Sequence, residues 1–165
     1  MNEHPIRKKL RLKNYDYSRS GMYFVTVCIK DRLPLLWENH TIAKETNNIS
    51  LSHTGAIVNT AIEQISSIYP SVTVAKYCIM PDHIHLIIQM QSDDSGRQIA
   101  APTLSTIIGQ MKRWVSKQSG QSIWQKSFID RIIRNEKEFL AIWQYIENNP
   151  KKLDTAYENI YPENT

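Results

Sequence analysis

The sequence predicts an α+β domain in which strands and helices follow one another as β-α-β-β-α-β, with one extra helix at the end. Four runs are rich in β-branched and aromatic residues, three segments have apolar residues at helical spacing, and their order alternates as this arrangement requires. This split-βαβ, or ferredoxin-like, order implies a four-stranded antiparallel sheet with its first two helices on one face. We expect the opposite face to stay free for a ligand.

Composition and length are those of a single globular domain. The chain has 165 residues, 41% of them hydrophobic, and no apolar run approaches the roughly 20 residues needed to span a bilayer. The basic N-terminus has no apolar segment behind it, which argues against a secretory signal. Two cysteines, Cys28 and Cys78, exclude a zinc site built on cysteine pairs and favour a reducing compartment. We expect a cytoplasmic protein with no membrane partner.

Charge is distributed unevenly, although the net charge is only +4. We expect a basic arm at residues 1–20, a folded domain at 21–153 and a polar tail at 154–165. Basic clusters attract phosphate backbones through counterion release, although a solvated surface is the simpler interpretation of any single cluster. The candidate DNA-binding residues are Arg7, Lys8, Lys9, Arg11, Lys13, Lys112, Arg113, Lys117, Arg131 and Arg134.

The predicted strands are the β-branched and aromatic runs. Residues 23–29 are apolar on both faces, which indicates a central strand. Residues 72–80 and 83–88 are separated only by a turn at Pro81, so they should pair as an antiparallel hairpin. Residues 128–134 form the fourth strand.

Two amphipathic helices are expected to cover this sheet. Residues 55–69 carry apolar side chains at spacings of three and four. Thr103 is a good N-cap for the second helix, whose apolar positions extend over residues 104–115. Gly109 lies inside this helix, where glycine costs about 1 kcal/mol relative to alanine. A close approach between helix and sheet would explain it.

The last predicted helix carries two polar residues of interest. Asn135 is its N-cap, with Glu138 three positions on as a capping box, and Pro150 ends it. Tyr145 and Asn149 are four residues apart and therefore share one helix face. A half-buried surface tyrosine and an ordinary helix-terminal asparagine are the simpler interpretations of these two residues.

Two histidines lie two residues apart on the second strand of the predicted hairpin. Because side chains alternate along a strand, His83 and His85 point to the same face and could grip a divalent cation. A pair of hydrogen-bonded histidines on a half-buried strand is the alternative. The amide oxygen of Asn149 could complete a site that leaves positions open for phosphate and water. Imidazole with oxygen ligands suits Mg²⁺ or Mn²⁺ in use.

Tyr145 is a candidate nucleophile for the same site. A phenol attacks weakly at neutral pH, because its pKa is about 10, and a cation on the attacked phosphate would stabilise the transition state. Attack would leave a phosphotyrosine and a free hydroxyl, so that a strand could later be rejoined. The alternatives are a DNA-binding protein without chemistry, and a phosphoesterase that uses water on a small nucleotide.

Several ordered motifs together resemble the REP-associated tyrosine transposases, which are HUH-type single-strand DNA transposases. The resemblance covers roughly residues 6–153. At two positions the chain departs from the family pattern, with Asp82 in place of asparagine and Arg131 in place of histidine. The matching stretches are residues 21–26, 78–88, 102–112, 123–125 and 128–138, together with Tyr145, Ile146, Asn149 and Pro150.

The resemblance implies a metal-dependent enzyme that nicks single-stranded DNA, often near short hairpins of repetitive extragenic palindromes, and transfers the cut strand. The family's paired histidines match His83 and His85, its nucleophile matches Tyr145, and its third metal ligand matches Asn149. In related transposases the tyrosine helix can be swapped across a homodimer. Tyr145 could therefore serve its own subunit or a partner.

Overall fold

The structure, a computed structural model, describes residues 21–38, 49–91 and 102–151. The predicted arm and tail therefore lie outside the described residues. The elements of the fold are β1 (Gly21–Cys28), η1 (Lys30–Arg32), α1 (His53–Ile68), β2 (Val72–Ile79), β3 (His83–Met90), α2 (Leu104–Ser119), β4 (Ile129–Ile133), α3 (Glu136–Asn148) and η2 (Asn149–Lys151). Their order confirms the predicted α+β fold with one extra helix. None of the described helices has the length and apolar character needed to cross a membrane.

The four strands form one sheet in the order β2-β3-β1-β4. β2 and β3 pair antiparallel, which confirms the predicted hairpin. β3 also pairs antiparallel with β1, where His85 lies opposite Thr26 and His83 lies opposite Cys28. The histidine strand is therefore central and is hydrogen-bonded along both edges.

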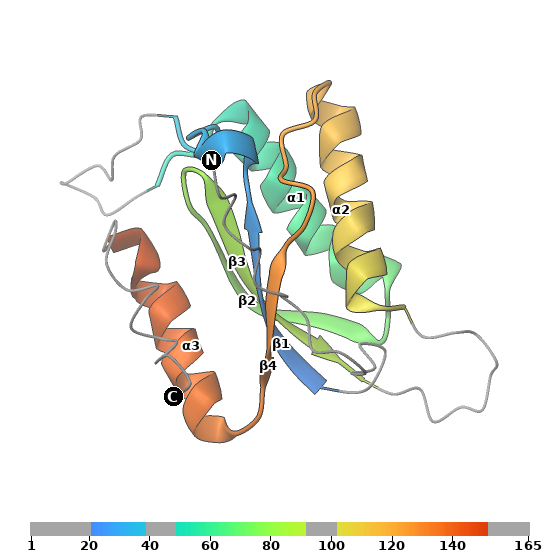
Figure 1. Cartoon of the computed structure of the whole chain (residues 1–165), viewed down its shortest axis with the longest axis vertical. Coiled ribbons are helices and arrows are strands. Elements are labelled where there is room, and N and C mark those ends of the chain that lie inside the picture. Colours follow the sequence, from blue (N-terminus) through green and yellow to red (C-terminus); the bar gives the residue numbers. More distant parts are fainter. Residues whose placement is uncertain (1–20, 39–48, 92–101, 152–165) are drawn as a thin grey trace, which may run out of the picture.

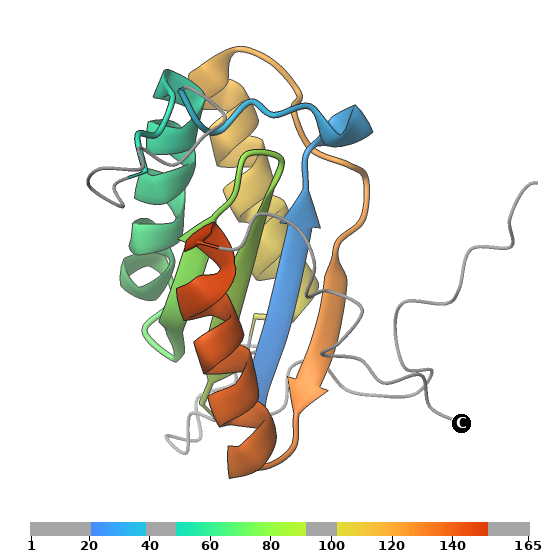
Figure 2. The ribbon, with the colours of Figure 1, turned by 90° about the vertical axis from the view of Figure 1, so that its left-hand side faces the viewer.

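The molecule has three layers, with the sheet in the middle (Figure 1). α1 and α2 pack against each other on one face, where Tyr77 of β2 donates a hydrogen bond to Asn59 of α1. α3 lies against β2 and β3 on the opposite face (Figure 2). The expectation of an open face is thus wrong for this half of the sheet, because α3 returns across it.

Alternation along the strands divides the buried side chains between the two faces. The face toward α1 and α2 carries fully buried apolar side chains, including Ile84, Leu86 and Val25. The other face carries His83 and His85, beneath α3. The hydrophobic core therefore fixes the register of β3, and the register in turn fixes the direction of both imidazoles.

The glycines require different explanations from the one that the sequence predicted. A Cβ at Gly109 would meet only Arg113 Nη1, at 3.7 Å, so the expected close approach of α2 to the sheet is absent. A Cβ at Gly55, by contrast, would clash with the carbonyl oxygen of Leu36. Close packing thus requires glycine at the start of α1. α2 ends at Gly120, which adopts the left-handed conformation (φ 74°) typical of a helix C-terminus.

Candidate active site

His83 and His85 project side by side from β3 toward α3. Their Nε2 atoms lie 3.2 Å apart, and their ring centroids are separated by 4.7 Å. The two imidazoles therefore share one face of the sheet, as their spacing in the sequence predicts. His85 is fully buried, whereas His83 is partly exposed.

The other ring nitrogen of each histidine has its own partner. His83 Nδ1 lies 2.6 Å from Asp82 Oδ1, and His85 Nδ1 lies 2.8 Å from Thr26 Oγ1. A carboxylate only accepts hydrogen bonds, so His83 donates through Nδ1–H and its neutral form presents a lone pair at Nε2. The Thr26 hydroxyl can accept or donate, so it can support either tautomer of His85. Partners of this kind orient imidazoles in metal sites.

Electrostatics keep the inner imidazole neutral. Burial lowers the pKa of His85 well below its usual value, and the neighbouring His83 lowers this pKa further. Partial burial by itself would raise the pKa of Asp82. The hydrogen bond with His83 and the charge of Arg32 outweigh burial, so this pKa lies below its usual value. At neutral pH the site therefore contains an ionised carboxylate and an uncharged His85.

Tyr145 reaches the histidines from α3. Its hydroxyl lies 3.3 Å from His85 Nε2, and its ring packs edge-on against His85 and Phe24. α3 is held on the sheet by its buried residues Ile142 and Ile146. The phenol oxygen and the two Nε2 atoms consequently converge on one place.

Asn149 lies at the C-terminal end of α3 and is buried. Its side chain is beside Cys78, the strand neighbour of His85. Burial raises the pKa of Cys78 to about 12, so this thiol is neutral. The Nδ2 atom of Asn149 is buried and has no nitrogen or oxygen partner among the described residues. This N–H group is available for a further interaction beside Cys78, whereas ligation of a cation would use the amide oxygen.

The donor set fits a divalent cation held partly by protein and partly by substrate. Two facing imidazole lone pairs repel each other unless a proton or a cation lies between them. Within the described residues no cluster of three histidine, cysteine or carboxylate side chains is arranged to hold a metal ion. A cation here would therefore depend on His83 and His85 together with neutral oxygens, which leaves room for phosphate.

Comparison with known proteins identifies the family. Residues 19–149 match the family model described as "Transposase IS200 like". The chain belongs to this transposase family. A Haemophilus influenzae protein named as a putative REP-associated tyrosine transposase is 31% identical to it in an alignment of 154 positions that covers 86% of this chain and 77% of the relative. The predicted family resemblance is confirmed.

Two further relatives are informative. An uncharacterized H. influenzae protein is 33% identical over 163 residues, covering 87% of this chain and 88% of its own length. A solved structure, described as a REP-associated tyrosine transposase bound to a REP hairpin, has a TM-score of 0.59 at 21% identity. That match covers 86% of this chain and 73% of the other, and it shows that the two proteins share a fold.

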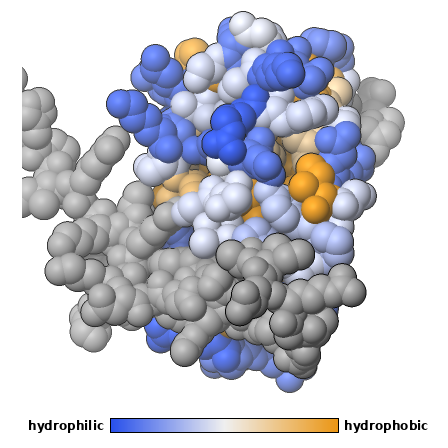
Figure 3. Space-filling model, turned by 90° about the vertical axis from the view of Figure 1, so that its right-hand side faces the viewer, coloured by the Kyte–Doolittle hydropathy of each residue, from blue (hydrophilic) through white to orange (hydrophobic). Residues whose placement is uncertain are grey.

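The predicted DNA-binding residues do not form one surface around the histidines of this transposase. Those of the basic arm, residues 7–13, lie outside the described residues. Arg113 and Lys117 are exposed on α2, across the sheet from the histidine pair. Figure 3 views this side of the molecule, where hydrophilic side chains dominate the described surface. Any DNA contact made by α2 is thus separate from the candidate site.

Three other predicted DNA-binding residues are near β4. Lys112 donates to the carbonyl oxygens of Gln125 (2.8 Å) and Ser127 (3.2 Å), so it already supports the segment that leads into β4. Arg131 forms an ion pair with Glu138 at 2.9 Å. Arg134 is exposed. Their roles in DNA binding stay predictions.

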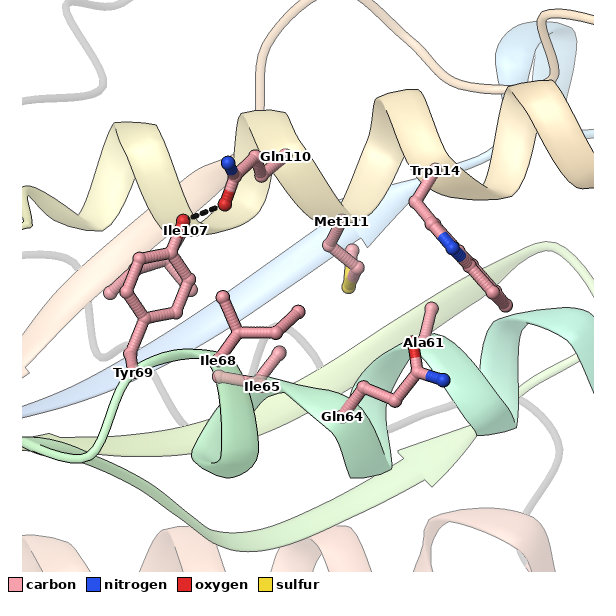
Figure 4. Close-up of a pocket in the computed structure, with 9 residues that line it drawn as sticks. All are labelled: Ala61, Gln64, Ile65, Ile68, Tyr69, Ile107, Gln110, Met111 and Trp114. Atoms are coloured by element: carbon pink, nitrogen blue, oxygen red, sulfur yellow. Dashed lines mark hydrogen bonds between the residues drawn. The ribbon is translucent and has the colours of Figure 1, made fainter.

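A groove of about 220 Å³ lies between α1 and α2, away from the histidines. Tyr69 and Trp114 lie near its two ends, and the Tyr69 hydroxyl donates to the Gln110 side chain (Figure 4). The lining is mostly apolar and contains no histidine or carboxylate. The groove therefore lacks the groups that phosphate chemistry requires, in contrast to the convergent histidines and Tyr145.

Proposed function

We propose that this transposase cuts single-stranded DNA beside hairpins and transfers the cut strand through a covalent phosphotyrosine on Tyr145. One observation carries the proposal: the Tyr145 hydroxyl lies 3.3 Å from His85 Nε2, which lies 3.2 Å from His83 Nε2. Membership of a transposase family supports a DNA-processing enzyme. A weak nucleophile within hydrogen-bond reach of an imidazole can be activated for attack on phosphorus.

Each residue has a distinct role in the proposed reaction. Tyr145 attacks a backbone phosphorus, a P–O bond of the DNA breaks, and the strand is left with a free hydroxyl. His85 Nε2 lies 3.3 Å from the phenol oxygen and positions it before a cation binds, and Asp82 and Thr26 orient the two imidazoles. Mg²⁺ or Mn²⁺ would be held by His83 and His85 with Asn149, and when bound it supplies positive charge against the phosphate oxygens.

The partner in this proposal is single-stranded or hairpin DNA. One solved relative is described as bound to a REP hairpin, which supports a ligand of this kind. We assign the chemistry to a catalytic domain at residues 21–153, phosphate contacts to the basic arm at 1–20, and no chemistry to the tail at 154–165. The cytoplasm is the proposed location, consistent with two free, buried thiols. A homodimer stays a prediction, and the short distance between Tyr145 and His85 favours attack within one subunit.

The first prediction concerns the nucleophile. The full chain is incubated with a 5′-labelled hairpin-flanked single strand and Mn²⁺, and the products are separated on denaturing gels. The unmodified protein should give a shortened strand and a covalent protein–DNA adduct. Tyr145→Phe should give neither, because it lacks the attacking oxygen, and it should still bind the hairpin.

Tyr69→Phe is the matched control, because Tyr69 lies on the opposite side of the sheet and should not affect cleavage. Equal cleavage by Tyr145→Phe would contradict the proposal. Hairpin binding without cleavage by the unmodified chain would instead favour a DNA-binding protein that has lost its chemistry.

A further inference from the structure

The turn after β1 places an arginine at the edge of the histidine site. Asp31 and Arg32 have φ values of 56° and 53°, in the left-handed region that residues other than glycine rarely adopt. Two consecutive residues in this region persist only where the surroundings hold them, and such positions cluster at functional sites. The strain at Asp31 and Arg32 therefore suggests that the conformation of this turn serves a function.

Hydrogen bonds from both sides fix this turn. Ile29 N–H donates to the carbonyl of Asp82 at 2.9 Å, and Lys30 N–H donates to the carbonyl of Ile123 at 2.8 Å. The preceding carbonyl, of Cys28, accepts from the N–H of Gln125 at 3.0 Å. The turn is thus held between the segment that precedes β3 and the segment that precedes β4. Its position relative to the histidines is set by the sheet.

The Arg32 side chain is hydrogen-bonded to the candidate site, but these bonds use only some of its N–H donors. Its Nε donates to Asp82 Oδ2 at 2.8 Å, and the other oxygen of the same carboxylate contacts His83 Nδ1 at 2.6 Å. Its Nη1 donates to Cys28 Sγ at 3.2 Å. The side chain is 52% exposed. Guanidinium carries five N–H donors, so the remaining donors are available to a ligand as far as the described residues are concerned.

We propose that Arg32 binds a phosphodiester of the single strand next to the one that Tyr145 attacks. The proposal rests on the proposed function. One oxygen of Asp82 contacts Arg32 and the other contacts His83. The guanidinium is therefore separated from the nearer imidazole by a single carboxylate group. Guanidinium binds phosphate oxygens through parallel N–H groups, which matches the donors left over here.

The other cations near the sheet are less suited to this role. Arg131 is paired with Glu138, and Lys112 donates to backbone carbonyls. Arg113 and Lys117 are on α2, across the sheet from the histidines. Among the described residues, Arg32 is thus the cation that is linked to the histidine pair, through the Asp82 carboxylate.

The test measures single-strand binding as a function of salt in a full chain that also carries Tyr145→Phe, so that no cleavage interferes. On a single strand, each phosphate that the protein neutralises adds about 0.7 to the steepness of log K against log salt. Arg32→Gln should make the slope shallower by this amount. Arg32→Lys, which keeps the charge, should restore the slope. Lys30→Gln, an exposed neighbour on the same turn, is the control and should leave it unchanged.

The Asp82→Asn variant distinguishes two possible roles of Arg32: binding phosphate itself, or only positioning Asp82. It removes the carboxylate charge and leaves Arg32 free for DNA, so the slope should not become shallower. An unchanged slope for Arg32→Gln would overturn the inference. Equal decreases in the salt slope for Arg32→Gln, Asp82→Asn and the double variant would also overturn the inference, because Arg32 would then act only through Asp82. Cleavage by the Tyr145-containing chain is scored separately, so failure of the proposed function is distinguishable from failure of this inference.

Discussion

At the scale of single residues, the candidate site includes a threonine that residue spacing in the sequence does not predict. Thr26 is buried in β1 and contacts His85 Nδ1 at 2.8 Å. It lies there because β1 and β3 pair in a register that places the two residues opposite each other. The grouping of His83, His85 and Tyr145 could be predicted from spacing and family motifs, whereas the contacts of Thr26 and Arg32 depend on cross-strand register and on a strained turn.

Removal of the Thr26 hydroxyl should weaken both the site and the fold. Thr26→Val keeps the shape of the side chain but leaves a buried imidazole nitrogen without its partner, which costs about 1–3 kcal/mol of unfolding free energy. Removal of such an outer partner typically lowers metal affinity by roughly 10–100-fold. Urea unfolding and Mn²⁺ titration by electron paramagnetic resonance measure the two effects.

The control for this change is Thr60→Val, which alters an exposed α1 hydroxyl that donates to the Ala56 carbonyl. It should change neither quantity appreciably. Mn²⁺ affinity in Thr26→Val equal to that of the unmodified chain would show that Thr26 does not orient the ligand.

At the scale of elements, local chemistry sets where helices begin and end. Thr103 and Asn135 accept hydrogen bonds from backbone N–H groups three residues on, as capping residues do. Glu138 differs in detail from a capping box, because its carboxylate accepts from Arg134 N–H. These signals lie within a few residues of one another in the sequence, which is why the element bounds were predictable.

The placement of α3 was less predictable, because it depends on contacts between distant parts of the chain. Lys76 of β2 lies 4.4 Å from the centre of the Trp143 ring and 3.6 Å from Glu147. Neither contact has a local sequence signal. The helix could be predicted from its periodicity, but not which half of the sheet it would cover.

Replacement of Gly109 should stabilise α2. Gly109→Ala adds a Cβ that meets only the flexible end of Arg113, at 3.7 Å. The unfolding free energy should rise by about 1 kcal/mol, the difference in helix propensity. Urea denaturation measures the change.

Gly55→Ala is the contrasting variant, because its Cβ would meet the Leu36 carbonyl, and it should destabilise the protein. A decrease in stability in Gly109→Ala would mean that α2 packs more tightly against its neighbours than the distances indicate.

At the scale of the whole molecule, the geometry of the candidate site is a property of the assembled sheet. Its groups come from β1, β3 and α3, and Tyr145 and His85 are 60 residues apart in sequence. Burial of His85 at the centre of this assembly links global stability to pH. The folded state excludes a proton that the unfolded chain accepts, so the unfolded state binds more protons below the usual histidine pKa.

Stability should therefore fall as pH drops below about 6.5, by up to about 1.4 kcal/mol per pH unit until the folded-state pKa of His85 is reached, and His85 should add no pH dependence above that window. The lowered pKa of Asp82 acts at more acidic pH, below its usual value of 3.8, and does not contribute in this window. Urea unfolding at pH 5.0 and pH 7.5 measures the difference. His85→Gln, which cannot titrate, should remove most of this difference. An unchanged pH dependence in His85→Gln would assign the effect to other groups.

The position of α3 after all four strands also has a consequence for timing during translation. The ribosome releases both histidines, with the strands that support them, before it releases the helix that bears Tyr145. On the proposed mechanism, a nascent chain would hold a nearly finished site without its nucleophile. Nicking would then become possible only once the last helix has been made and has docked, so an unfinished chain would be harmless to nearby DNA.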